Sequence, residues 1–251
     1  MPPLNEPLFR STATQRYASL VTGQVSVLGV KPLVAVRAPA AAAAAPNEAA
    51  TYLAGIIRAI CQAHEMWRLQ ASLTGVTVNA VTAHGGVATG PNIGDLIGGA
   101  GPRTGAFGGA SAITTAVAQG LGKWWAGFQA SIKVPGLPWY PAFAAFPGAI
   151  APPMPNVPTP LIALAPPITP QTQGQIKEQM TAQLHTTSPN ASELVDAIAT
   201  GFAAALQVWL PAQMVSNVLA TGPIPSWAPP YVPVGPVVGG TTLPTSGHFA
   251  G

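Results

Sequence analysis

The sequence VPGLPWYPAFAAFPGAIAPPMPNVPTPLIALAPPITP, residues 134–170, contains twelve of the chain's 29 prolines and no Asp, Glu, Lys or Arg. Proline has no N–H group to donate, and its ring clashes with the preceding helical turn. Neither a long helix nor a central β-strand therefore fits this stretch. We predict an extended, polyproline-like arm. Because burial of each of its large apolar side chains is worth roughly 1.5–3 kcal/mol, we expect the arm to lie on a second surface.

The whole chain is unusually poor in charge. Of its 251 residues, 7% are Asp, Glu, Lys or Arg and 48% are hydrophobic, whereas an ordinary soluble domain has about 25% charged residues. The length suffices for one large or two modest domains with a real core. Since so little charge is available to cover a monomer, we expect much of the surface to be held against other molecules.

Charge distribution and cysteine content exclude several classes of protein. The net charge is +3, and the ten Lys and Arg residues are scattered singly, without a basic stripe, so no nucleic-acid partner is expected. Cys61 is the only cysteine, which rules out an intrachain disulfide. The first residues contain no apolar segment after a basic start, so a cleaved signal peptide is not indicated.

A membrane-interacting protein is the alternative that the sequence leaves open. No charged residue follows Asp196, and residues 197–220, AIATGFAAALQVWLPAQMVSNVLA, are long enough to cross a bilayer. Against insertion stand Gln207, Pro211 and Gln213 within this window, and the lack of flanking basic residues that would fix an orientation.

Apolar residues spaced three and four apart predict strong helices over residues 48–73 and 111–133. A short helix is expected at residues 11–20, and two more are expected to begin after Thr169 and Asn190, both suitable N-cap residues. Valine-rich residues 24–30 and 33–36 predict an edge hairpin. From Gly75 to Gly109 we expect one short strand followed by a long, glycine-rich, irregular loop.

These elements predict a mainly α fold, with Ala/Gly-rich helices, minor N-terminal β-structure and long extended Pro-rich arms. Five regions are expected: 1–46, an N-terminal arm with a short helix and strands; 47–133, a helical core with a Gly-rich loop; 134–170, the Pro/aromatic arm; 171–220, C-terminal helices; and 221–251, a Pro/Gly-rich tail.

No motif indicates an enzyme. Cys61, His64 and Glu65 lie within one helical turn, but they are too few to close a metal site, and the second histidine of HExxH is missing. The glycine-rich run GPNIGDLIGGAGPRTG has neither GK[ST] nor GxGxxG. With seven carboxylates in the chain and no Ser-His-Asp set, we predict no catalytic residue, no metal and no cofactor.

Residues 123–161, KWWAGFQASIKVPGLPWYPAFAAFPGAIAPPMPNVPTPL, resemble the small structural proteins of tailed phages and related contractile injection particles. The resemblance covers about residues 111–170 and lies in the uncharged Ala/Gly/Pro texture and in helices that end in aromatic arms. It implies a structural subunit of a phage-tail or baseplate-like particle. Such a subunit would contact copies of itself or other subunits, and would reside in a virion or extracellular particle assembled in the cytoplasm.

Aromatic side chains of the two Pro-rich arms are the candidate interface residues, because rigid aromatic groups bury much area at little entropic cost. We therefore expect another subunit to be contacted by Trp139, Tyr140, Phe143, Phe146, Trp227 and Tyr231.

Overall fold

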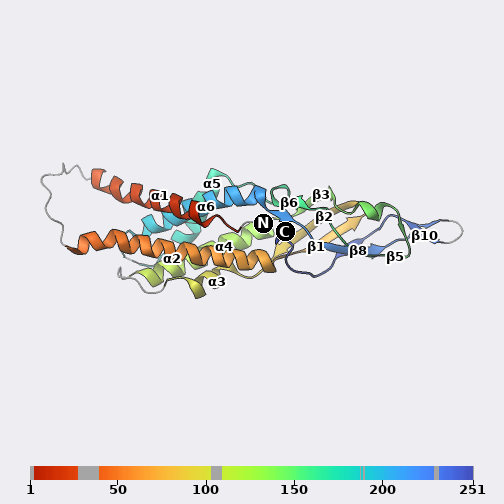
Figure 1. Cartoon of the computed structure of the whole chain (residues 1–251), viewed down its shortest axis with the longest axis horizontal. Helices are drawn as coiled ribbons and strands as arrows, with labels where there is room; N and C mark the ends of the chain where they lie inside the picture. The colour runs from red at the N-terminus through yellow and green to blue at the C-terminus, as the bar shows by residue number, and fades with distance from the viewer. Residues whose placement is uncertain are drawn as a thin grey trace.

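Helices and strands occupy opposite ends of an elongated molecule (Figure 1). The computed structural model describes residues 3–27, 40–102, 109–186, 188, 190–228 and 232–250. The helical end consists of α1 (Glu6–Val27), α2 (Ala40–Gln70), α3 (Ile93–Ala100), α4 (Ala110–Ala130), α5 (Pro170–Thr181) and α6 (Ala191–Ala212).

A six-stranded antiparallel sheet dominates the other end. Its order is β3–β2–β1–β11–β8–β5, with β1 (Ser72–Asn79), β2 (Thr82–Thr89), β3 (Val134–Pro138), β5 (Ile150–Pro155), β8 (Leu219–Pro223) and β11 (Gly240–Thr242). Two smaller sheets are formed by β4 (Phe146–Pro147) with β10 (Val232–Gly235) and β9 (Trp227–Ala228), and by β6 (Thr159–Pro160) with β7 (Met214–Val215). Short 3₁₀ helices are η1 (Pro141–Ala144) and η2 (Leu161–Ala163).

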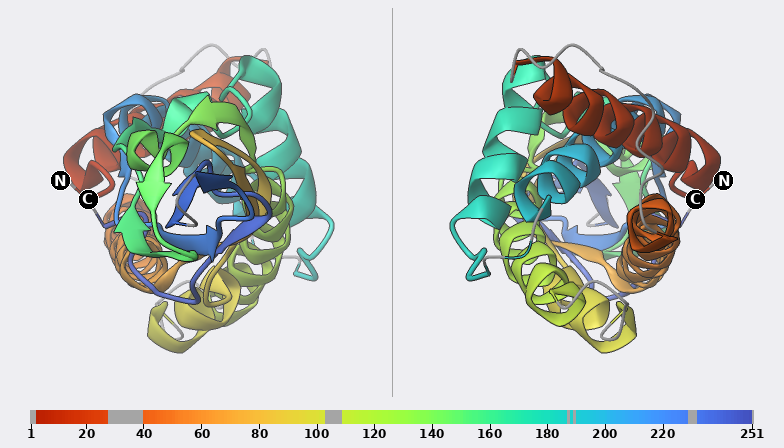
Figure 2. Two further views of the ribbon diagram at one scale, coloured as in Figure 1. Left: turned by 90° about the vertical axis from the view of Figure 1, so that its right-hand side faces the viewer. Right: turned by 90° about the vertical axis from the view of Figure 1, so that its left-hand side faces the viewer.

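α6 is the central helix of the helical end. It contacts α1, α2, α4 and α5, and the right-hand view of Figure 2 shows it among these helices. Close packing depends on Gly201, where an added Cβ would lie 2.6 Å from the Phe9 ring and 2.7 Å from the Phe9 carbonyl oxygen. α1 can therefore approach α6 this closely only because residue 201 has no side chain.

The main sheet curls so that its two outer strands come together. The backbone N–H of Val157, just after β5, donates to the carbonyl of Trp139, just after β3, at 2.9 Å. The left-hand view of Figure 2 shows the strands arranged around the long axis. The rings of Tyr140 and Phe143 are buried and stacked with centroids 5.1 Å apart, and the Tyr140 hydroxyl donates to the Val218 carbonyl.

The predicted mainly α fold is wrong, because the antiparallel sheet draws its strands from most of the chain. The Pro/aromatic arm of 134–170 is wrong as well, since it folds back as β3, η1, β4, β5, β6 and η2. β3 and β5 are the two outermost strands of the main sheet. Proline has no backbone N–H group, but it is tolerated in an edge strand because one side of that strand has no hydrogen-bonded neighbour. Prolines also lie in the central strands β8 (Pro223) and β10 (Pro233), so proline content does not exclude β-structure here.

The predicted C-terminal arm is also folded, because it supplies β9, β10 and β11 and ends at the junction of the two halves. Phe249 is fully buried, with its ring 5.1 Å from that of Trp67. Its carbonyl accepts from Gln213 Nε2 at 2.6 Å, and Arg68 Nη1 donates to the Ala250 carbonyl at 3.0 Å. Arg68 is buried at this junction.

Two further predictions are corrected nearer the N-terminus. α1 extends to Val27, so residues 24–27 of the predicted hairpin are helical, while residues 28–36 lie outside the described part of the chain. The glycine-rich region is not one irregular loop, because it contains β2 and α3. Val-rich β1 pairs with β2 in a regular hairpin, and the Asn92 side chain caps α3 by accepting from the Gly94 amide.

The helices predicted over residues 48–73 and 111–133 are present as α2 and α4, and most of their apolar residues are buried, but both end three residues earlier than predicted and residues 72–73 belong to β1. Thr169 and Pro170 begin α5 as predicted, with a capping box that Thr172 completes. Asn190 precedes α6, but its backbone is left-handed (φ 62°) and its side chain makes no capping hydrogen bond. The sequence therefore predicted where α6 begins, but not the conformation of the residue that precedes it.

Substitution of Gly201 tests the α1–α6 contact. We expect Gly201→Ala to lower the free energy of unfolding by about 1–3 kcal/mol, because the new methyl group overlaps Phe9. Gly127→Ala in α4 is the matched control, since a Cβ there meets nothing within 4 Å, and it should raise stability by about 0.5–1 kcal/mol. Urea unfolding measures both, and equal stabilisation by the two substitutions would contradict the packing.

Candidate interaction surface

Formal charge is absent from the parts of the chain that form the described strands. No Asp, Glu, Lys or Arg occurs in residues 69–94, 134–176 or 197–251, and these three stretches contain every strand of the described structure. The main sheet and the two small sheets therefore carry no formal charge. We call this part of the molecule the β end (Figure 1).

Large aliphatic side chains are exposed on the β end. Exposure is 68% for Ile150, 47% for Val238 and 37% for Val234. Ile150 lies opposite Pro223 in the β5–β8 pair, and the Val238 amide donates to the Pro223 carbonyl, so both residues adjoin Pro223. Val234 lies opposite Pro147 in the β4–β10 pair. We call Ile150, Val234 and Val238, with the prolines beside them, the β tip.

The predicted interface residues lie mostly elsewhere. Trp139, Tyr140 and Phe143 are buried within their own chain, and Phe146 is half-buried in β4. For Trp227 only the backbone is described, as part of β9, and Tyr231 lies outside the described residues. A contact between subunits through these residues stays a prediction. Sequence reasoning missed the β tip, although the lack of charge in its segments was a usable signal.

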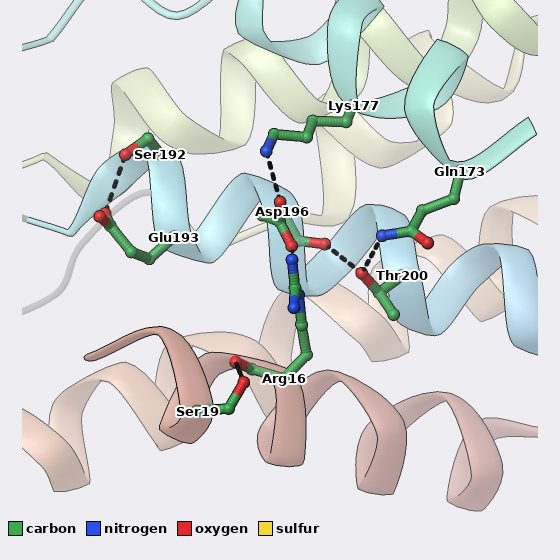
Figure 3. Close-up of polar contacts among 8 residues, drawn as sticks. All are labelled: Arg16, Ser19, Gln173, Lys177, Ser192, Glu193, Asp196 and Thr200. Carbon is green, nitrogen blue, oxygen red and sulfur yellow. Dashed lines mark hydrogen bonds and ion pairs between the residues drawn. The ribbon is translucent and has the colours of Figure 1, made fainter. Parts of the chain in front are cut away.

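At the other end, a buried carboxylate joins three helices (Figure 3). Asp196 of α6 accepts from Arg16 Nε of α1 at 2.6 Å and from Lys177 Nζ of α5 at 2.5 Å. Gln173 of α5 donates to Thr200, whose hydroxyl donates to the Asp196 backbone carbonyl. Burial alone would raise the pKa of Asp196, but the hydrogen bonds from Arg16 and Lys177 outweigh it and the pKa is lowered.

His64 is the second buried ionisable group of note, and it lies where α2, α4 and α6 meet. Its ring centroid is 4.5 Å from that of Trp209 and 5.3 Å from that of Trp125, both edge to face. Neither ring nitrogen has a hydrogen-bond partner among the described residues. The aromatic contacts exclude water from the imidazole, and this burial lowers the pKa of His64 to about 3.

Two grooves on the described helical end contain few ionisable side chains. A groove of about 710 Å³ between α3 and α4 is lined mainly by small and polar residues, with Asp95 and Lys123 as its charged groups. A second, of about 500 Å³, lies between α4 and α5. Within the described ranges, no three His, Cys, Asp or Glu residues are placed to hold a metal ion.

Comparisons with known proteins give no relative. No protein-family model matches the chain, and no curated protein or solved structure matches it significantly.

The burial of His64 predicts a pH-dependent stability. Above about pH 6.5 the imidazole is neutral in both states, so it adds no pH dependence. Below that pH the unfolded chain binds a proton that folded His64 does not accept. The free energy of unfolding should therefore fall by about 1.4 kcal/mol per pH unit, or about 2 kcal/mol at pH 5.

His64→Leu should remove this part of the slope between pH 7 and pH 5, as measured by urea unfolding at each pH. Some slope should remain, because burial also lowers the pKa of His248. His185→Gln, at an exposed histidine, is the control and should keep the full slope. An unchanged slope in His64→Leu would show that His64 is not buried as described.

Proposed function

We propose that this chain is a structural subunit of a multi-subunit particle, of the phage-tail or baseplate-like kind that the sequence resembles. The observation that supports this most is the uncharged β end, with aliphatic side chains exposed at its tip. A surface of this composition is typical of one that a neighbouring subunit covers in the assembled state.

The distribution of charge affects how each end of the molecule behaves in water. Charged side chains keep protein surfaces apart in water, and a patch without them tends to associate. Every charge of this chain is placed outside the strand-forming stretches. Exposed apolar area that is covered on assembly contributes about 25 cal/mol per Å² before the entropic cost of association. The β end is thus suited to a permanent contact, and the helical end to water.

Insertion into a membrane is the less favoured function. α6 is the one helix in the described structure that is long and apolar enough to cross a bilayer, but 72% of that window is buried within the chain. The predicted window of 197–220 is also not one helix, because α6 ends at Ala212 and β7 and β8 follow.

Sedimentation of lysate from cells that naturally produce the chain tests the proposal. We expect the chain in a fast-sedimenting particle of fixed stoichiometry. Ile150→Lys should reduce its incorporation by about 10-fold or more, because covering an unpaired charge costs several kcal/mol. Val208→Lys is the matched control, since Val208 is 50% exposed on α6, and it should incorporate normally.

Liposome co-sedimentation of the purified chain supplies the opposing outcome. A chain that stays free of any particle and pellets with vesicles of zwitterionic lipid would contradict the proposed function and favour a membrane role.

A further inference from the structure

We propose that the surface which covers the β tip is the β tip of a second copy of this chain. This inference rests on the proposed function and names the partner at the site described above. It is carried by the charge distribution, the clustering of exposed aliphatic residues and the state of the sheet edges.

Charge complementarity selects the partner. A covered patch that contains no Asp, Glu, Lys or Arg offers no ion-pair partner for a charged side chain on the opposing surface. Such a charge would be desolvated without compensation, at a cost of several kcal/mol. An ordinary protein has about 25% charged residues, so few of its surfaces avoid this cost. The chain's own β end avoids it completely, because residues 69–94, 134–176 and 197–251 carry no charge.

The same distribution keeps repulsion low. Among the residues that the structure describes, every Asp, Glu, Lys and Arg lies outside the strands. In the elongated molecule, the helical end is remote from the β tip (Figure 1). Two copies that meet at their β tips therefore bring no like charges together, and identical patches can form a self-complementary contact.

The contact is made by side chains and not by strand addition. The outer strands β3 and β5 contain prolines, which cannot donate to a partner strand. Beyond these strands, the Val157 amide already pairs with the Trp139 carbonyl. Extension of the main sheet by a second copy is thus disfavoured, whereas Ile150, Val234 and Val238 present exposed aliphatic groups. Two copies therefore associate by packing these aliphatic side chains against the same side chains of the other copy.

Sedimentation-velocity centrifugation of the purified chain over a range of concentrations tests the inference. We expect reversible association of the natural chain. A triple variant with Ile150→Lys, Val234→Lys and Val238→Lys should associate about 100-fold more weakly, because like charges then meet. The matched control, Met66→Lys with Leu69→Lys and Val208→Lys, changes three side chains exposed by 43%, 50% and 50% on helices and should associate as the natural chain does. Equal melting temperatures would show that the variants fold.

Salt dependence provides a second readout. A contact without charges should be almost insensitive to NaCl between about 0.05 and 0.5 M, whereas a charged interface would weaken. The inference is overturned if the natural chain is monomeric at about 100 µM, or if the tip and control variants associate equally. If the natural chain is monomeric when purified but still enters a particle, the inference that a second copy covers the β tip is wrong, whereas the proposed function is unaffected. Failure to enter any particle would instead count against the proposed function.

Discussion

The structure depends on one constraint, which is that a chain with seven carboxylates and ten basic residues has very little charge to distribute. None of the charge in the described ranges is placed on the strands. At the helical end, one of the seven carboxylates is buried between three helices and fixed by two of the ten cations. The side chains of Arg16 and Lys177 are 40% and 45% exposed. They therefore pair with Asp196 and also contribute charge to the solvent-exposed surface. As a result, the helical end presents charged side chains to water, whereas the β end presents only side chains without formal charge.

Both ends nevertheless share one core. Buried residues of the helices and of the sheet form a continuous hydrophobic cluster, and an aromatic group at the junction joins them: Trp67, Trp125 and Trp209 surround His64, while Phe249 packs on Trp67. The C-terminal segment is fixed there through Arg68 and Gln213. Because α2, α4, α6 and the C-terminal segment all contribute to this group, we expect the two ends to unfold together.

The sequence predicted what local patterns determine. Apolar residues three and four apart located α2 and α4, and Thr169 with Pro170 located the start of α5. It failed where the structure depends on pairing between strands that are far apart in the sequence. No local pattern shows that β3 lies at one edge of the main sheet and β5 at the other. It was also misled by large aromatic residues such as Trp139, whose apolar character indicates burial but not which surface supplies it. The lack of charge in residues 134–176 and 197–251 indicated which part of the chain would form the candidate surface. The positions of Ile150 and Val238 on that surface could be found only from the folded structure.

Hydrogen–deuterium exchange of the chain, free and assembled, would test the central claim most directly, because backbone amides report which surface becomes covered. We predict that assembly slows exchange in β4, β5, β8 and β10 and in the segment around Val238, while the exposed turns of α1, α4 and α5 exchange as they do in the free chain. Protection confined to the helical end, with unchanged exchange in the β end, would contradict the claim that the uncharged end is the covered one.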